Sequence, residues 1–127
     1  MKTPIATAAA PQAIGPYSQA VQSRPWLFLS GQIGLDPSTG ALVTGGVAAE
    51  TERVLENLRA VLAAAGAGLD DVVRTTIYLI DLNDFGTVNE VYARFFRAPF
   101  PARATVGVAA LPRGARVEID AIAVMGN

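Results

Sequence analysis

The order of helix-type and strand-type segments most restricts the fold of this chain. Residues 47–65 repeat apolar side chains at helical spacing, and residues 85–96 do so again. Between them, residues 72–82 form a β-branched and aromatic run, apolar on both faces, as in a central strand. Four further segments have the composition of strands: residues 17–22, 26–30, 104–109 and 116–124. Two helices can cover only one face of a sheet, so the sequence predicts an α+β fold of order ββαβαββ with both helices on one face of the sheet.

The ends of both predicted helices carry recognisable signals. Glu50 and Glu52 fall in the first turns of the first helix, where acidic side chains complement the helix dipole, and Gly66 stands where that helix should stop. Asn83 or Asp84 is available to cap the second helix. These signals place the helix boundaries to within a few residues.

The first sixteen residues differ from the rest in composition. They hold three prolines and a run of alanines, which predicts an extended lead-in without regular structure. A chain of 127 residues suits one hydrophobic core, and no internal repeat or low-complexity tract divides it. We therefore expect a single domain over residues 1–127.

The last predicted strand presents two different faces. Side chains alternate along a strand, so its residues divide into two sets. One set is Val117, Ile119, Ala121 and Ala123, and the other is Glu118, Asp120, Ile122 and Val124. Both sets contain apolar residues, but the two helices can bury only one of them. The simplest cover for the other face is a second copy of the chain, and we expect a homo-oligomer.

The residue types that are absent restrict the chemistry. The chain has no cysteine and no histidine, which excludes thiol nucleophiles, histidine triads and the common zinc ligand sets. Its only lysine is Lys2, near a terminus and badly placed for a Schiff base. No Asp-rich loop has the spacing of a calcium site. Any acid-base work falls to carboxylates, and we expect neither a cofactor nor a metal.

The charge distribution and hydropathy bear on partners and location. Ten basic and eleven acidic residues leave a net charge of −1, without the basic patch that binds nucleic acid. No apolar stretch is of signal-peptide type or long enough to span a membrane. We expect a cytoplasmic protein that binds neither nucleic acid nor membranes.

Arg103 and Glu118 are candidates for chemistry, but their local pattern leaves two explanations open. Arg103 follows the prolines that end the second helix, where it suits either an exposed surface position or bidentate binding of a carboxylate. Glu118 alternates with apolar residues, as on the wet face of a strand; in a cleft, desolvation makes the same carboxyl a usable acid or base. Periodicity alone does not choose between these.

Several motifs spread over nearly the whole chain resemble the RidA/YjgF family of enamine/imine deaminases. They are AIGPYSQA at 13–20, SGQIG at 30–34, VRTT at 73–76, DLNDF at 81–85, FPAR at 100–103, LPRG at 111–114 and VEI at 117–119. The resemblance implies a chorismate-mutase-like subunit that assembles as a homotrimer, with sites in the clefts between neighbours. The trimer agrees with the uncovered sheet face.

The resemblance also implies a site and a reaction. By position, the family's site residues fall on Tyr17, Ser30, Gly31, Asn89, Arg103, Thr105 and Glu118. Arg103 is expected to hold the carboxylate of a small 2-imino acid, and Glu118 to orient or deprotonate the attacking water. The hydroxyls of Tyr17 and Ser30 and backbone N–H groups near Gly31 or Thr105 are expected to position substrate or stabilise charge. The products are a 2-oxo acid and ammonia.

One departure and two alternatives accompany this interpretation. Thr105 stands where well-known bacterial members have cysteine; it keeps the backbone N–H and a hydroxyl but no thiol. A non-catalytic module that binds a 2-oxo acid in the same cleft is the first alternative. A ribonuclease or translation inhibitor is the second, and the missing histidine and near-neutral charge speak against it.

Overall fold

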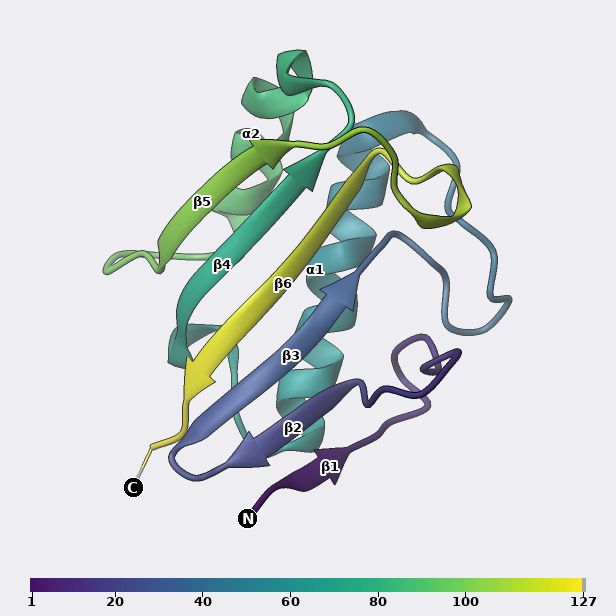
Figure 1. The fold of residues 1–127 in the computed structure, drawn as a ribbon. Helices are drawn as coiled ribbons and strands as arrows, with labels where there is room; N and C mark the ends of the chain where they lie inside the picture. The colour runs from purple at the N-terminus through teal and green to yellow at the C-terminus, as the bar shows by residue number, and fades with distance from the viewer. Residues whose placement is uncertain (127) are drawn as a thin grey trace.

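A six-stranded mixed sheet is the frame of the structure, a computed structural model that describes residues 1–126 (Figure 1). Its strands are β1 (Thr3–Ile5), β2 (Ala20–Ser23), β3 (Trp26–Gln32), β4 (Val72–Leu79), β5 (Ala102–Gly107) and β6 (Val117–Val124). The spatial order is β1-β2-β3-β6-β4-β5, and only β4 and β5 run parallel. β6 therefore lies near the middle, paired with β3 and β4.

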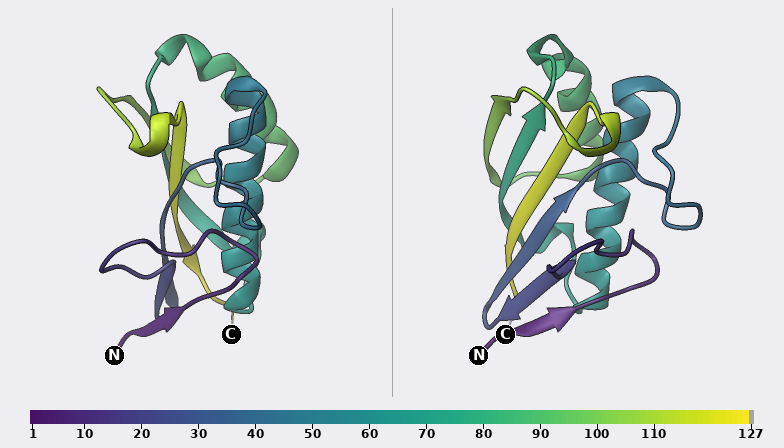
Figure 2. Two further views of the ribbon diagram at one scale, coloured as in Figure 1. Left: turned by 90° about the vertical axis from the view of Figure 1, so that its right-hand side faces the viewer. Right: turned by 45° about the vertical axis from the view of Figure 1, so that its right-hand side comes forward.

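Two helices, α1 (Gly46–Ala64) and α2 (Phe85–Phe95), pack on the same face of the sheet, as predicted (Figure 2). The buried side of α1 carries the predicted apolar stripe: Val54, Leu55, Leu58, Val61 and Leu62. Gly66 ends this helix as expected, with a φ of 80°. The Gly66 N–H donates to the Ala63 carbonyl at 3.0 Å, and the Ala67 N–H donates to the Leu62 carbonyl at 2.9 Å, which is the Schellman arrangement.

The side chains at the helix starts are only partly as predicted. Asp84 stands at the N-cap of α2, as one of the two predicted candidates, but its side chain makes no capping hydrogen bond, and no acidic residue lies in the first turn of α1. Asp81 accepts the Asn83 N–H at 2.9 Å in a preceding 3₁₀ turn, Leu82–Asp84. The Asp84 carboxylate instead binds the Arg116 guanidinium at 2.8 and 3.1 Å. Glu50 is 4% exposed and accepts the Arg116 backbone N–H at 2.8 Å. Glu50 and Asp84, which the local pattern assigned to the helix ends, thus both bind Arg116, which is distant in sequence.

The N-terminal lead-in contains a strand that the sequence did not predict. β1 pairs antiparallel with β2, with Pro4 opposite Val21. Proline cannot donate to a ladder, but at a sheet edge that missing donor costs nothing. Two other strands are displaced: β2 begins at Ala20 rather than residue 17, and β5 begins at Ala102, so Arg103 lies inside a strand.

The face of the sheet opposite the helices has no cover in one chain. Along β6 the predicted alternation is confirmed, since Val117, Ile119, Ala121 and Ala123 are buried while the intervening residues are half-buried. On β3, Trp26 and Phe28 are each 46% exposed and pair in register with Val124 and Ile122. This open face is apolar at that end, and the expected homo-oligomer stays a prediction.

We expect Leu58→Ala to lower the free energy of unfolding by about 2–5 kcal/mol, because Leu58 is 1% exposed beneath the sheet and its truncation leaves a cavity. Urea unfolding at one fixed protein concentration measures this. Glu52→Ala, on the exposed side of the same helix, is the control and should change stability by less than about 0.5 kcal/mol. Equal losses for the two variants would contradict the assigned core face.

Candidate active site

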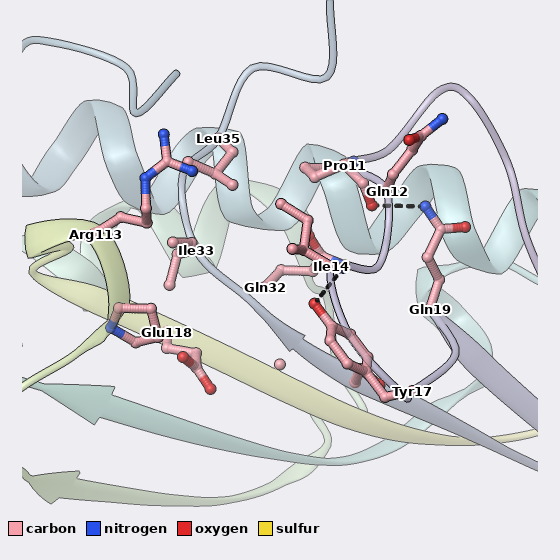
Figure 3. Close-up of a pocket in the computed structure, with 13 residues that line it drawn as sticks. Pro11, Gln12, Ile14, Tyr17, Gln19, Gln32, Ile33, Leu35, Arg113 and Glu118 are labelled. Carbon is pink, nitrogen blue, oxygen red and sulfur yellow. Dashed lines mark hydrogen bonds between the residues drawn. The ribbon is translucent and has the colours of Figure 1, made fainter. Parts of the chain in front are cut away.

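A pocket of about 520 Å³ opens around the first residues of β6 (Figure 3). Four of the predicted site residues line it: Tyr17, Ser30, Gly31 and Glu118. They come from the segment between β1 and β2, the end of β3 and the start of β6, as Figure 3 shows for Tyr17 and Glu118. These residues, distant in sequence, form one group, which we call the Glu118 group.

Gly31 allows Glu118 to lie directly against the backbone of β3. The β3–β6 register shifts between Leu29 and Gln32, so Gly31 stands in an irregularity of the ladder. A Cβ at this position would lie 2.3 Å from Glu118 Oε2 and 2.9 Å from its Cδ. The glycine is needed here for the close approach of the carboxylate, since any side chain would displace it.

The two hydroxyls of the Glu118 group differ in their hydrogen bonds. Ser30 Oγ donates to the Ser18 carbonyl at 2.6 Å, which leaves its lone pairs for an incoming donor. Tyr17 is 54% exposed, and its hydroxyl accepts only a long 3.4 Å contact from the Ile14 N–H. The phenolic proton of Tyr17 is therefore available to a ligand.

Gln19 is a residue of this pocket that sequence reasoning missed. It is 4% exposed, and its Nε2 donates to the carbonyls of Thr7, Ala10 and Pro11 at 3.0, 3.3 and 2.7 Å. Its Oε1 accepts the Thr7 N–H at 2.7 Å. One buried amide thus holds the lead-in against the sheet and forms a pocket wall. A glutamine directly before a strand was the only sequence signal.

The carboxyl of Glu118 has altered acidity. Partial burial raises its pKa above the ordinary value of 4.5, and the nearby charge of Asp120 raises that pKa further. Arg113 is the basic residue at the rim, where its Nη2 donates to the Gly40 carbonyl at 3.0 Å. Glu118 is thus a carboxylate that binds a proton more readily than an ordinary one.

Arg103 lies on the other face of the sheet. In the parallel β4–β5 pair it is level with Thr75, whose side chain is buried under the helices. Its guanidinium carbon lies 5.0 Å from the ring centre of Tyr92 and 5.4 Å from that of Phe85, both on α2. The two rings hold the guanidinium by cation–π attraction.

Asn89 and Thr105 belong with Arg103. Asn89 follows Phe85 by four residues and precedes Tyr92 by three, which places it on the same side of α2. Thr105 follows Arg103 by two on β5 and so shares its face. Both are half-buried. We call these three residues the Arg103 group.

One chain does not bring the two groups into one cavity. No member of the Arg103 group lines the 520 Å³ pocket. Glu118 projects from the open face and is level with Tyr78 of β4, whereas Arg103 projects beneath the helices at the β5 edge. In one chain the two groups therefore lie on opposite faces of the sheet.

The part of the chain that the structure describes contains no group of three or more Asp, Glu, His or Cys side chains that could hold a metal ion. Over residues 1–126, neither helix is long and apolar enough to cross a membrane.

Known proteins resemble this chain over almost its full length. The model of the family described as Endoribonuclease L-PSP matches residues 7–125. The chain is 59% identical over 122 residues to a mouse protein named 2-iminobutanoate/2-iminopropanoate deaminase, covering 96% of this chain and 90% of the relative.

Two solved structures are similar in both fold and sequence. One is RidA from the Antarctic bacterium Psychrobacter, with a TM-score of 0.94, 46% identity and coverage of 97% and 99% of the two chains. The other is TdcF from E. coli with bound serine, with a TM-score of 0.93, 43% identity and coverage of 98% and 99%.

The Tyr92 ring that contacts Arg103 is held by a hydrogen bond of 2.8 Å between the buried hydroxyls of Tyr92 and Thr75, and the contribution of this bond to stability can be tested. Tyr92→Phe leaves the Thr75 hydroxyl without this partner, and we expect a loss of about 1–3 kcal/mol in the free energy of unfolding. The double variant with Thr75→Val removes both groups and should cost less than the sum of the single losses, as measured by urea unfolding. Strictly additive losses would argue against coupling between the hydroxyls.

The raised pKa of Glu118 predicts how stability depends on pH. Below pH 4.5 the carboxyl is protonated in both the folded and the unfolded chain. As the pH rises from there through the higher folded pKa, the unfolded chain loses its proton first, and folding stability falls. Glu118→Gln removes this penalty, so its Tm should exceed that of the wild type at pH 7 and match it near pH 4.

Calorimetry at the two pH values measures the difference, with Glu52→Gln as a control for loss of an exposed carboxylate. A lower Tm for Glu118→Gln at pH 7 would show that the folded chain favours the charged form of Glu118.

Proposed function

This chain belongs to the RidA/YjgF family, whose model is the one described as Endoribonuclease L-PSP. We propose that it hydrolyses 2-imino acids to 2-oxo acids and ammonia. The protein is an enzyme that acts on a small molecule, with 2-iminobutanoate and 2-iminopropanoate as its substrates. The observation that carries the proposal is the likeness of nearly the whole chain to relatives named for this activity, at 59% identity to the mouse protein and 56% to the human one.

The chemistry of the Glu118 group supports this reaction. A carboxylate that readily binds a proton can take one from water as the water attacks the C=N carbon of the protonated imine. The resulting neutral carbinolamine carries a hydroxyl and an amine, and protonated Glu118 returns the proton to the amine. The C–N bond breaks as the hydroxyl becomes a carbonyl, the departing ammonia takes up the hydroxyl proton and leaves as ammonium, and Glu118 is again a carboxylate. One water is consumed for each imine, and no oxidant, metal or covalent intermediate is needed.

The Arg103 group suits the other end of the substrate. A guanidinium held between two rings is preorganised for the planar carboxylate of a 2-imino acid. The E. coli relative TdcF has a structure with bound serine, a small amino acid that carries the same carboxylate. Asn89 and the backbone N–H of Thr105 are further donors for orienting the substrate.

We place the working site between subunits of a homotrimer. The apolar open face around Trp26, Phe28 and Ile122 supports self-association, because such a face is costly to leave in water. An assembly also allows the Glu118 group of one subunit to meet the Arg103 group of the next. The cytoplasm is the proposed location, since amino-acid dehydratases release such imines there.

Ribonuclease activity is the second candidate, because the matched family model is described as an endoribonuclease. The chain has no histidine for general acid-base cleavage and a net charge of −1. RNA cleavage that is lost in Glu118→Gln and weakens steeply with salt would establish this candidate.

Activity is tested by generating 2-iminobutanoate in situ and following 2-oxobutanoate release above the spontaneous rate. Arg103→Ala should lower kcat/KM by about 100-fold or more, through loss of the carboxylate partner. Glu118→Gln should lower kcat by about 10²–10⁴-fold. A wild-type rate no higher than that of Arg103→Ala would refute the proposal. Binding of 2-oxobutanoate without turnover would instead identify a metabolite-binding module.

The shared site can be tested by mixing the two inactive variants. After co-refolding of equal amounts of Arg103→Ala and Glu118→Gln chains, about a quarter of the sites in a closed ring combine an intact Glu118 with an intact Arg103 from the neighbour. We therefore expect about a quarter of wild-type activity. Each variant refolded alone is the control, and a mixture as inactive as its components would place both residues in sites within one chain.

A further inference from the structure

A second carboxylate, which the proposed hydrolysis does not use, lies beside Glu118. Asp120 follows Glu118 by two residues on β6, so both side chains project from the open face, at Cα positions about 6.6 Å apart along the strand. Tyr78 of β4 is the register partner of Glu118. Its hydroxyl donates a 2.9 Å hydrogen bond to Asp120 Oδ2. The three side chains form one cluster across two strands.

The hydrogen bond fixes where the Asp120 carboxylate lies. The O–H of Tyr78 donates to Asp120 Oδ2, and this bond raises the pKa of the Tyr78 phenol. Glu118 lies directly against the backbone of Gly31. Partial burial and the nearby charge of Asp120 both raise the pKa of Glu118, so Glu118 binds a proton more readily than an ordinary glutamate does.

The other charged or titratable groups around Glu118 are few. The segment between β1 and β2 contributes Tyr17. The rim contributes Arg113, whose guanidinium donates to the Gly40 carbonyl and points away from Glu118 in Figure 3. β3 contributes Ser30 and Gly31, which carry no charge. On β4, Arg74 is level with Ile122, further along the sheet. Asp120 is thus the charge best placed to act on Glu118.

We propose that Asp120, whose carboxylate is held in place by the Tyr78 hydroxyl, is a positioning residue that makes Glu118 retain the proton taken from water until the amine can accept it. The inference rests on the proposed hydrolysis, in which one carboxyl must first take a proton and then return it. A carboxyl of ordinary acidity would lose that proton to solvent near neutral pH. A fixed negative charge nearby opposes this loss.

The main test is the pH dependence of kcat/KM for Asp120→Asn, which keeps the shape of the side chain and an acceptor for Tyr78. Activity of the wild type should fall on the acidic side as Glu118 becomes protonated. In the variant this limb should move down by about 0.5–1 pH unit, the effect of one charge at this separation in a partly aqueous site. The kcat should fall more than KM changes. Glu52→Gln removes an exposed carboxylate from α1 and should leave the limb in place.

A direct titration of Glu118 by NMR on glutamate-labelled protein, assigned with Glu118→Gln, should show the same downward shift in Asp120→Asn. Tyr78→Phe is the second variant, because it keeps both carboxylates. Its acidic limb should move down by less than that of Asp120→Asn, because the Asp120 carboxylate remains nearby without the hydroxyl that holds it. A limb as low as that of Asp120→Asn would mean that packing, rather than charge, is responsible, and would overturn the inference.

The two proposals fail in different ways. Active enzyme with an unmoved acidic limb and unmoved Glu118 titration in Asp120→Asn overturns the role of Asp120 and leaves the deaminase standing. A wild-type protein without deaminase activity overturns both the proposed function and the catalytic role of Asp120, even where the NMR titration still detects the charge coupling.

Discussion

The alternation of side chains along β6 is the constraint on which most of this structure depends. The strand lies between β3 and β4, and every second residue, from Val117 to Ala123, is buried beneath the helices. The same period places Glu118 and Asp120 together on the opposite face. A shift of register by one residue would exchange the two sets, burying both carboxylates and exposing the core residues. The apolar packing of α1 therefore also fixes the position of Glu118 and Asp120.

Much of the fold follows from period and composition, because burial imposes those patterns directly. The stripe of α1, the stop at Gly66 and the two faces of β6 were predictable for this reason. The features that failed depend on partners distant in sequence. β1 forms by pairing with β2, where Pro4 lies opposite Val21 at the edge of the sheet. The Asp84 carboxylate binds Arg116, just before β6, and makes no capping hydrogen bond. Local pattern contains no information about either partner.

The candidate site divides in the same way. Which residues belong to it came from motif resemblance, and the structure adds where they lie. The opposite orientation of Arg103 and Glu118 is set by the parallel register of β4 and β5, which aligns Arg103 with Thr75, and by β6, which aligns Glu118 with Tyr78. Register between separate strands cannot be read from one sequence. The buried amide of Gln19 was missed for a related reason, since its partners lie 8–12 residues away in a segment without periodic pattern.

The separation of the two groups has a physical logic for a reaction that needs both a cation and a proton-binding carboxyl. In one chain the two groups lie on opposite faces of the sheet, and each keeps its own surroundings: aromatic rings around Arg103, and a partly buried acidic pair at Glu118. In the proposed shared site the guanidinium of the neighbouring chain would come near Glu118 and favour its charged form. A substrate carboxylate bound by Arg103 would neutralise much of that cation before Glu118 acts. Under this proposal the surroundings of the carboxylate clamp and of the proton acceptor are built by different chains, and activity depends on assembly.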